Sequence, residues 1–261
     1  MELPIFAAAI YLVMVFYAPD FVKQPFSLKK PLAIWNLILA AFSIMGASRC
    51  IPVFLEKFQK GFGYSVCGDV SYLSGPSGLW MALFIYSKFF ELVDTLFLIL
   101  HKRQVIFLHW FHHLTVLLYC WHAFCYGVSS GLWFATMNYV VHSIMYTYYC
   151  LMVFRGLRKY VRPFAPLITC IQLAQMVGGI VVNVHAATTL AENKPCHVHP
   201  STWKLGLGMY ACYFLLFAML FNDKFIAPKT KKKLCNTAAC NATDAAGMFR
   251  TESKTNLKKL A

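Results

Sequence analysis

Long apolar stretches, each about the length of a membrane-crossing helix, dominate this chain of 261 residues. Hydrophobic residues make up 59% of the sequence and charged residues 13%, whereas ordinary soluble domains have roughly a quarter charged residues. Lipid offers no partners to free backbone N–H and C=O groups, so an apolar run in a bilayer has to form a helix. The sequence therefore predicts an all-α, polytopic membrane protein.

The apolar runs predict where the helices cross. We expect seven transmembrane helices, at residues 3–18, 32–54, 79–100, 105–126, 131–154, 164–186 and 203–222. A single transmembrane domain then occupies residues 1–226. The remaining residues, 227–261, are polar and basic and lack helical periodicity, so we expect a disordered tail.

The distribution of Lys and Arg predicts the orientation of the spans. If the segment after the first span faces the cytosol, most of the 24 basic residues lie on the cytosolic side. The positive-inside rule then places the N-terminus in the lumen and the C-terminus in the cytosol. The chain ends with Lys258 and Lys259 followed by two residues, which resembles the dilysine retrieval signal of endoplasmic-reticulum membrane proteins. We therefore expect a multi-pass protein of that membrane.

The net charge of +14 has two explanations. One is the topology alone, since the positive-inside rule demands cytosolic Lys and Arg. The other is that some of these residues recruit an anionic, water-soluble substrate. Nucleic acid is not an expected partner, because the positive charges are spread over short loops and a tail.

Two of the ten cysteines differ from the rest by position. Most cysteines lie inside apolar spans, where a free thiol behaves as a small hydrophobe. Cys67 and Cys196 both fall in predicted lumenal loops. An oxidising lumen permits a disulfide, and we predict one between them.

Three histidines, His109, His112 and His113, lie on one face of the span at 105–126. Positions i, i+3 and i+4 are neighbours on a helix, so the three imidazoles project together. A bilayer tolerates such groups where they face a protein interior or a wet cavity. This cluster is the leading candidate for a functional site.

Three other spans carry polar residues at helical spacing. They are Lys88, Glu91 and Asp94; Asn138, His142 and Tyr146; and Thr169, Gln172 and Gln175. At about 1.5 Å of rise per residue, all of them reach the layer of the histidines, in the cytosolic half of the membrane. Two of the sets also have a structural explanation: Lys88 and Glu91 as an ion pair, and the glutamines as links between helices. Their shared depth favours one common site.

Clustered histidines serve two chemistries. Imidazole binds iron or zinc, as in the histidine boxes of di-iron membrane desaturases and hydroxylases. Here four histidines lie at the right depth, too few for two irons, although a mononuclear site stays open. Imidazole is also a base near neutral pH and a covalent nucleophile, which suits metal-free acyl transfer.

Four motifs, in this order, resemble the ELO family of very-long-chain fatty-acid elongases, and the resemblance covers residues 25–226. They are Lys88-Phe-Phe-Glu91-Leu-Val-Asp94-Thr95, His109-x-x-His112-His113, Asn138-x-x-x-His142-x-x-Met145-Tyr146-x-Tyr148-Tyr149 and Thr169-x-x-Gln172-x-x-Gln175. The resemblance implies a 3-oxoacyl-CoA synthase, which condenses acyl-CoA with malonyl-CoA and releases CoA and carbon dioxide. It also implies a seven-helix bundle in which six helices surround a narrow substrate tunnel sealed at the lumenal end.

The resemblance extends to substrate and partners. The region from Ile106 to Tyr119 looks most similar to elongases of saturated and monounsaturated chains, so we favour medium-to-long saturated acyl-CoA. No cofactor is implied beyond the two CoA substrates. The reductases and the dehydratase of the elongation cycle, and membrane lipid, are the implied partners, and a homodimer stays open.

We hypothesise a two-step route in which His112 attacks the acyl thioester and malonyl-CoA then takes the acyl group. In this hypothesis the other site residues orient groups, shuttle protons or donate hydrogen bonds to the enolate or oxyanion: His109, His113, His142, Asn138, Tyr146, Gln172 and Gln175, with Lys88, Glu91 and Asp94 holding them in place. A Cys120 or Cys170 nucleophile is a lesser alternative. The alternatives of another class are an iron-dependent desaturase or hydroxylase and a seven-helix transporter or receptor.

Overall fold

The computed structural model describes residues 2–227 and, over that range, contains helices and no strand. Residues 1–221 form one compact unit, and a second unit begins at Asn222 with a π-helix, η3 (Asn222–Ile226). The helices of the first unit are α1 (Glu2–Phe21), α2 (Lys29–Gln59), α3 (Phe62–Cys67), η1 (Ser71–Leu73), α4 (Gly75–Glu91), α5 (Val93–Leu100), α6 (Phe107–Cys125), α7 (Gly131–Val153), α8 (Arg155–Val161), η2 (Arg162–Phe164), α9 (Ala165–Ala191) and α10 (Pro200–Phe221). Lys258, Lys259 and the predicted tail beyond residue 227 lie outside the described residues.

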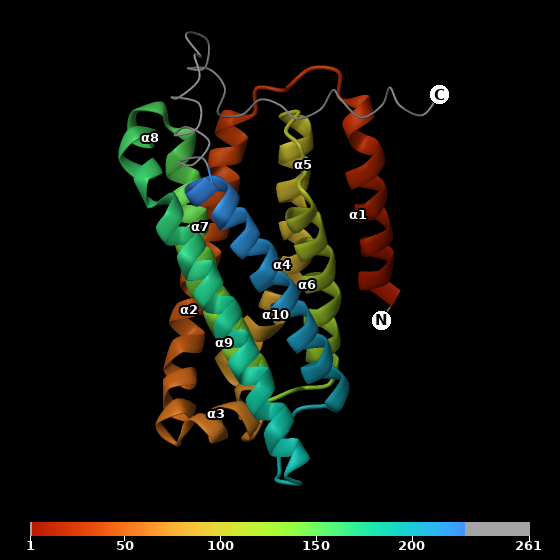
Figure 1. Ribbon diagram of the computed structural model, residues 1–261, viewed down its shortest axis with the longest axis vertical. Helices are drawn as coiled ribbons and strands as arrows, with labels where there is room; N and C mark the ends of the chain where they lie inside the picture. The colour runs from red at the N-terminus through yellow and green to blue at the C-terminus, as the bar shows by residue number, and fades with distance from the viewer. Residues whose placement is uncertain (1, 228–261) are drawn as a thin grey trace. The chain divides into compact units, whose positions relative to one another are not determined.

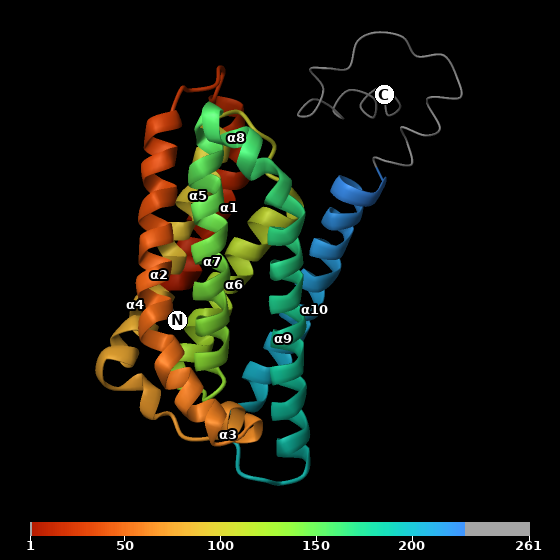
Figure 2. The same cartoon turned by 90° about the vertical axis from the view of Figure 1, so that its left-hand side faces the viewer.

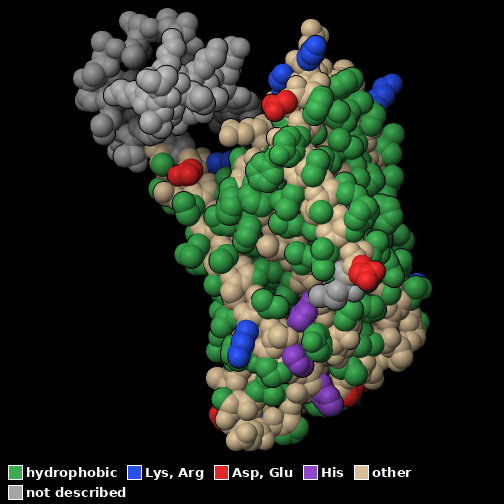
Figure 3. All heavy atoms as spheres, turned by 90° about the vertical axis from the view of Figure 1, so that its right-hand side faces the viewer, with side chains coloured by type: hydrophobic (Ala, Val, Ile, Leu, Met, Phe, Trp, Pro, Cys, Tyr) green, Lys and Arg blue, Asp and Glu red, His purple; other side chains and the backbone are tan. Residues whose placement is uncertain are grey.

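Within the described range, four helical segments are long and apolar enough to cross a membrane: Glu2–Phe21, Lys29–Gln59, Arg155–Ala191 and Pro200–Ile226. Figure 3 shows one face of the molecule, and hydrophobic side chains cover most of its middle. The chain is therefore an all-helical, multi-pass membrane protein. The other three predicted spans coincide with α4–α5, α6 and α7, which carry the Lys88, histidine and Asn138 motifs. The first of these spans is interrupted at Leu92, so α4 and α5 are each too short to qualify, and polar side chains lower the hydropathy of α6 and α7.

The long helices pack in neighbouring pairs. Figures 1 and 2 show α2 beside α7 and α9 beside α10, while α6 contacts both α4 and α10. Two of these pairs approach closely at a glycine: Gly46 of α2 faces the Tyr139 ring, and Gly179 of α9 faces the Tyr210 ring. A methyl group at either position would overlap the ring. Small residues at such crossings allow the close packing that holds helices together in lipid.

One end of the unit gathers the loops that we predict to be cytosolic. At the top of Figure 1, the segment between α1 and α2 lies at the same end as α8 and the last turn of α5. The Phe26 N–H donates to the Leu100 carbonyl at 2.9 Å. The Lys102 Nζ donates to the carbonyls of Val22 and Lys23 at 2.9 and 3.0 Å. These hydrogen bonds link the segment between α1 and α2 to the end of α5 and the loop that follows it.

The opposite end, where α3 lies, is cross-linked. Cys67 and Cys196, 129 residues apart in sequence, form a disulfide. The His197 N–H donates to the Cys67 carbonyl at 3.2 Å, and the Ser129 N–H donates to the His197 carbonyl at 2.8 Å. The Ser129 hydroxyl adds a bond to the Val66 carbonyl at 2.5 Å. Three loops that are remote in sequence are thereby held together.

The predicted helix at 79–100 is not continuous. The structure divides it into α4 and α5 at Leu92, where the Leu92 N–H donates to the Phe89 carbonyl and the Thr95 N–H to the Leu92 carbonyl. Bonds to the third residue back are typical of a locally tightened helix. No Gly or Pro marks this point in the sequence, so hydropathy alone predicts one helix. The tightened turn separates Glu91 from Asp94 and Thr95.

Candidate active site

A buried ion pair forms the centre of the polar layer. The Lys88 Nζ on α4 donates to Glu91 Oε1 at 2.7 Å, and the Ser87 hydroxyl donates to the same oxygen at 3.3 Å. The Lys88 Nζ also donates to Asn138 Oδ1 on α7 at 3.0 Å. The predicted ion pair is thus present, and it is linked across helices. Charges inside an apolar protein are tolerated when they are paired in this way.

The same network orients His142. Because Asn138 Oδ1 accepts from Lys88, its amide nitrogen is left to face His142 Nε2, at 3.0 Å. An amide nitrogen can donate and cannot accept, so His142 Nε2 is the acceptor and Nδ1 carries the proton. His142 Nδ1 lies 3.8 Å from Glu91 Oε1. Lys88 and Asn138 therefore select one tautomer of His142.

Asp94 is held from two other helices. The Trp35 Nε1–H on α2 donates to Asp94 Oδ1, and the Tyr146 hydroxyl on α7 donates to Oδ2, both at 2.7 Å. A carboxylate with both oxygens occupied is fixed in position. Asp94 therefore links α2, α5 and α7 beside the ion pair, and Tyr146 lies against the His142 ring, with centroids 5.3 Å apart.

Two of the three α6 histidines lie against each other. His109 and His113 have ring centroids 4.5 Å apart, and His109 Nε2 hydrogen-bonds the Thr95 hydroxyl of α5 at 3.0 Å. His113 is buried, and within residues 2–227 its Nδ1 has no hydrogen-bond partner. Glu91 Oε2 also lacks a partner in that range. Unsatisfied buried polar atoms are uncommon in native proteins and mark places where a ligand or water is expected.

His112 differs from the other histidines of the site. The residue is partly exposed, and its ring makes no hydrogen bond among the described residues. The Tyr213 ring of α10 lies 5.0 Å away, centroid to centroid, and the Tyr213 hydroxyl donates to the His112 backbone carbonyl at 3.3 Å. His112 also lies within electrostatic range of His142 and Glu91. Both ring nitrogens are therefore free to meet a substrate.

The α9 residues do not join this network in the described structure. The Gln172 Nε2 contacts the Met145 sulfur at 3.4 Å, and Gln175 lies against Tyr210. The Thr169 hydroxyl donates back to the Ala165 carbonyl of its own helix. The structure therefore brings together Lys88, Glu91, Asp94, Asn138, His142 and Tyr146 and places the α6 histidines beside them. Gln172 and Gln175 contact neighbouring helices instead.

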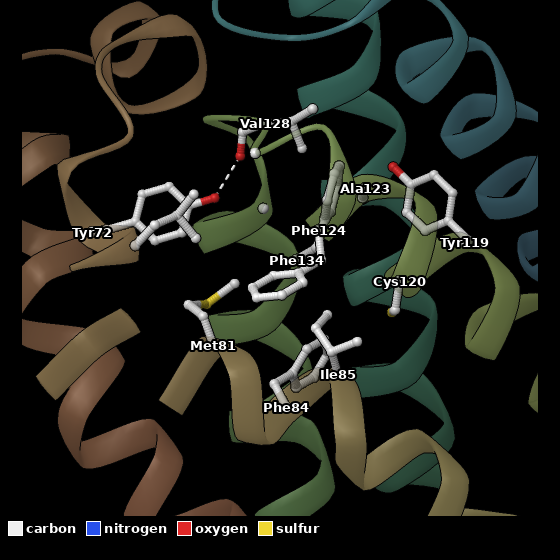
Figure 4. A pocket seen from close by; sticks show the side chains of 13 residues that line it. Tyr72, Met81, Phe84, Ile85, Tyr119, Cys120, Ala123, Phe124, Val128 and Phe134 are labelled. Atoms are coloured by element: carbon white, nitrogen blue, oxygen red, sulfur yellow. Dashed lines mark hydrogen bonds between the residues drawn. The ribbon is translucent and has the colours of Figure 1, made fainter. Parts of the chain in front are cut away.

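A small apolar cavity of about 30 Å³ lies between α4, α6 and α7 on the side of the cross-linked loops. Figure 4 shows Met81, Phe84, Ile85, Cys120 and Phe134 around it. At the loop end the Tyr72 hydroxyl donates to the Val128 carbonyl at 2.5 Å. The Phe84 ring joins this cavity to the polar layer, because the Lys88 Nζ lies 4.2 Å from its centroid.

The side chains named for the metal and thiol alternatives lie in different parts of the structure. Within residues 2–227, no group of three or more His, Cys, Asp or Glu side chains is placed to hold a metal ion. His109 and His142 each direct Nε2 at a neighbouring polar side chain, Thr95 and Asn138 respectively. Cys120 lines the apolar cavity, and Cys170 is exposed on α9.

Sequence reasoning missed several partners of the site. Trp35, Tyr213 and Tyr11 are aromatic residues in apolar spans, where nothing in the local pattern distinguishes them from packing residues. Thr95 follows Asp94 directly within the first motif, yet sequence analysis gave it no role. Adjacent helical residues point in different directions, which is the available signal: Asp94 faces α2 and α7, so Thr95 faces α1 and α6.

Known proteins resemble this chain over most of its length. A family profile described as "ELO: GNS1/SUR4 family" matches residues 1–233. "Fatty acid elongase 3" of Trypanosoma cruzi (strain CL Brener) is 40% identical, with 89% of this chain and 87% of that protein covered. "Very long chain fatty acid elongase 6" of Gallus gallus is 41% identical, covering 87% and 85%, and its namesake in Drosophila melanogaster is 40% identical, covering 89% and 76%. By the family profile and by these identities, this chain belongs to the GNS1/SUR4 (ELO) family.

Proposed function

We propose that this protein is the condensing enzyme of fatty-acid elongation, a 3-oxoacyl-CoA synthase acting on a medium- or long-chain acyl-CoA and malonyl-CoA. The observation that carries the proposal is His112, a partly exposed residue whose ring makes no hydrogen bond among the described residues, beside a buried layer of histidines and an ion pair. Several relatives that share about 40% of the sequence are named fatty acid elongases. A nucleophile has to be accessible to the substrate, whereas the residues around it have to be fixed in position by packing and hydrogen bonds.

The first half-reaction forms an acyl-enzyme. A ring nitrogen of His112 attacks the thioester carbonyl carbon, so a C–N bond forms while the C–S bond breaks. The CoA thiolate leaves and takes the proton that the imidazole gives up. His142 Nδ1–H, selected by Lys88 and Asn138, is a candidate donor to the developing oxyanion.

The second half-reaction makes the new carbon–carbon bond. Malonyl-CoA loses carbon dioxide, and the electron pair stays on the α-carbon as an enolate. This carbon attacks the acyl carbonyl, the C–N bond breaks, and His112 takes back one proton from solvent. Glu91 Oε2 and His113 Nδ1, the two unpartnered atoms of the layer, are candidates for contacts with substrate in this step. The scheme requires no metal or other cofactor.

The placement of the substrates follows from the two ends of the unit. We propose that seven spans cross the membrane of the endoplasmic reticulum, with the N-terminus lumenal and the C-terminus cytosolic. The disulfide supports a lumenal position for its end, because such bonds persist in oxidising compartments. CoA then enters at the opposite, basic end, near exposed residues such as Arg155 and Lys159.

The apolar cavity supports an acyl tail that points away from the CoA end. We propose that six helices surround a tunnel that continues this cavity and is closed by the cross-linked loops. A cavity of about 30 Å³ has room for water-sized groups and not for a long acyl chain, so binding such a chain requires neighbouring side chains to move. We favour saturated or monounsaturated acyl chains. The reductases and dehydratase of the cycle would act on the product, and the protein functions alone or as a homodimer.

One assay tests the proposal. Purified protein is incubated with labelled malonyl-CoA and a panel of acyl-CoA lengths, and the same sample undergoes metal analysis. We expect labelled 3-oxoacyl-CoA two carbons longer than the acyl substrate. A desaturase would instead contain iron and consume oxygen, and a transporter or receptor would bind or move ligand without any product from malonyl-CoA.

Incubation with acyl-CoA alone tests the intermediate. We expect an added acyl mass on the peptide that contains His112, with release of one CoA. If the complete assay yields product but incubation without malonyl-CoA gives no such adduct, the two-step route is rejected while the condensation stays intact.

A further inference from the structure

A tyrosine of the first helix reaches the polar layer. The face of α1 that packs on the protein contains Pro4, Ala8, Tyr11 and Val15, one side of the helix, and α1 contacts α5 and α6. The Tyr11 side chain is 1% exposed, whereas Tyr17 on the same helix is 63% exposed. A buried phenol needs a hydrogen-bond partner, most of all in lipid.

The partner of Tyr11 is a threonine that also contacts His109. The Tyr11 hydroxyl lies 2.9 Å from the Thr95 hydroxyl, and that hydroxyl lies 3.0 Å from His109 Nε2. Thr95 is fully buried, at 0% exposure. Three helices, α1, α5 and α6, are thus joined by two consecutive hydrogen bonds.

The donors in this chain can be ordered by counting protons. If Tyr11 donates to Thr95, the Thr95 hydroxyl donates to His109 Nε2, and every hydroxyl proton has an acceptor. In the reverse order His109 donates to Thr95 and Thr95 to Tyr11. The phenol proton would then have no acceptor among the described residues. The first order leaves instead the Nδ1 proton of His109, a partly exposed residue whose Nδ1 is not among the fully buried atoms that lack a partner. An unpaired donor costs about 1–3 kcal/mol when it is buried, as the Tyr11 phenol is, so the first order is favoured.

We propose that Tyr11 and Thr95 are positioning residues that fix the orientation and the tautomer of His109, leaving its Nδ1 protonated. This inference rests on the proposed function, in which the α6 histidines perform the acyl transfer. The His109 ring lies 4.5 Å from that of His113, which lies 5.3 Å from that of His112, centroid to centroid. Because the His109 ring packs against His113, and His113 against His112, fixing the His109 ring limits the positions open to the other two rings.

The arrangement matches that of His142 on the other side of the layer. There a Lys88–Asn138 chain directs a donor at Nε2 and leaves Nδ1 protonated. Here a Tyr11–Thr95 chain does the same to His109 with neutral groups. The two outer histidines share one tautomer, and α1 is the element that supplies the second relay.

The test uses variants that remove one hydroxyl at a time. Tyr11→Phe and Thr95→Val keep the shape of the side chain, Thr95→Ser keeps the hydroxyl, and Tyr17→Phe is the matched control on the exposed side of α1. kcat and KM for condensation are measured for each purified full-length protein, together with its thermal unfolding temperature.

We expect kcat to fall about 10-fold in Thr95→Val and about 5-fold in Tyr11→Phe, the effect of one lost neutral hydrogen bond, with KM changed less than about 2-fold. Thr95→Ser should restore kcat, and Tyr17→Phe should match the wild type. Because the bonds act in series, the double variant Tyr11→Phe/Thr95→Val should be no slower than Thr95→Val alone. Additive losses, or a Thr95→Ser as slow as Thr95→Val, would overturn the relay.

A second readout does not depend on activity. Nitrogen NMR of histidine-labelled protein reports which ring nitrogen carries the proton, and the His109 signal is identified by its loss in His109→Gln. We expect Nδ1 protonated in the wild type and a mixture of tautomers in Thr95→Val. If the wild type forms no product from malonyl-CoA yet shows this change, the proposed function fails and the relay holds. If product forms and neither kcat nor tautomer changes in Thr95→Val, the relay fails alone.

Discussion

Two buried lysines of this protein are paired with carboxylates at the same distance but in different surroundings. Lys57 and Asp69 lie 2.7 Å apart at the cross-linked end, and Lys88 and Glu91 lie 2.7 Å apart in the polar layer. Both oxygens of Asp69 are engaged: Oδ1 accepts from Lys57 and from the Ser71 N–H, and Oδ2 accepts from the Tyr64 hydroxyl.

Glu91 is not saturated in this way. Its Oε1 accepts from Lys88 and Ser87, while Oε2 has no partner among the described residues. Its side chain is 4% exposed, against 48% for Asp69. The half-exposed Asp69 has hydrogen-bond partners on both carboxylate oxygens, whereas the buried Glu91 has partners on one oxygen only among the described residues. We infer that the first pair stabilises the loops and the second takes part in chemistry.

The strongest contrast is expected between a histidine of each region. His112→Ala should reduce condensation about 10³-fold or more, because it removes the proposed nucleophile. His122→Ala, at the other end, should keep activity within 2-fold, since the His122 ring hydrogen-bonds Ser201 rather than the polar layer. Product formation measures both, and unchanged unfolding temperatures control for folding. A fully active His112→Ala would remove His112 from the mechanism.

Replacing each lysine should lower the free energy of unfolding by different amounts for the two ion pairs. Lys88→Met leaves Glu91 charged and buried, which costs about 3–5 kcal/mol for a broken buried pair. Lys57→Met should cost about 1 kcal/mol, the scale of a partly exposed pair, because Asp69 keeps its bonds to Ser71 and Tyr64 and contacts solvent. Thermal unfolding in one detergent compares them. Equal losses would show that the two pairs play the same role.

Breaking the disulfide tests whether the cross-linked end is structural. Cys67→Ser should lower stability by about 2–4 kcal/mol, the usual contribution of a disulfide that closes a long loop. Activity per folded molecule should stay within 2-fold of the wild type. Cys125→Ser, which changes an exposed free cysteine at the end of α6, is the control. A large loss of kcat in folded Cys67→Ser would extend the site to this end.

The smallest effect is a pH dependence at Asp69. The Lys57 ammonium, and after it the Ser71 and Tyr64 donors, hold the pKa of Asp69 well below its usual range. A lowered folded pKa stabilises the protein above the unfolded pKa of about 3.9 and is lost as the pH falls through the folded pKa. Asp69→Asn should lower the unfolding temperature by about 3 °C at pH 7.

The same comparison at lower pH checks the sign. The difference between wild type and Asp69→Asn should stay constant from pH 7 to 5 and shrink below about pH 4, where the unfolded chain binds the proton. Unfolding temperatures measured at each pH report it. A difference that grows on acidification would contradict a lowered pKa.

The sequence by itself determined the helices and the layer that they share. Apolar length predicts a helix in lipid because every backbone bond has to be made within the segment. Six of the predicted spans each coincide with one helix of the structure, and the span at 79–100 is divided into α4 and α5. Helical spacing placed Lys88, Glu91 and the histidines on common faces because that periodicity is local. Counting spans placed Cys67 and Cys196 on the same side, and the structure links them by a disulfide, with Cys67 at the end of α3.

The tertiary structure decided what each side chain contacts. Leu92 interrupts a helix without Gly or Pro, the Asn138 amide turns toward Lys88, and Gln172 meets Met145 rather than a histidine. Tyr11 and Thr95 are 84 residues apart, and no sequence pattern relates them. Their contact depends on how α1 packs against α5. Periodicity states which face a residue occupies; the partner on the opposing helix depends on packing between segments that sequence spacing does not relate.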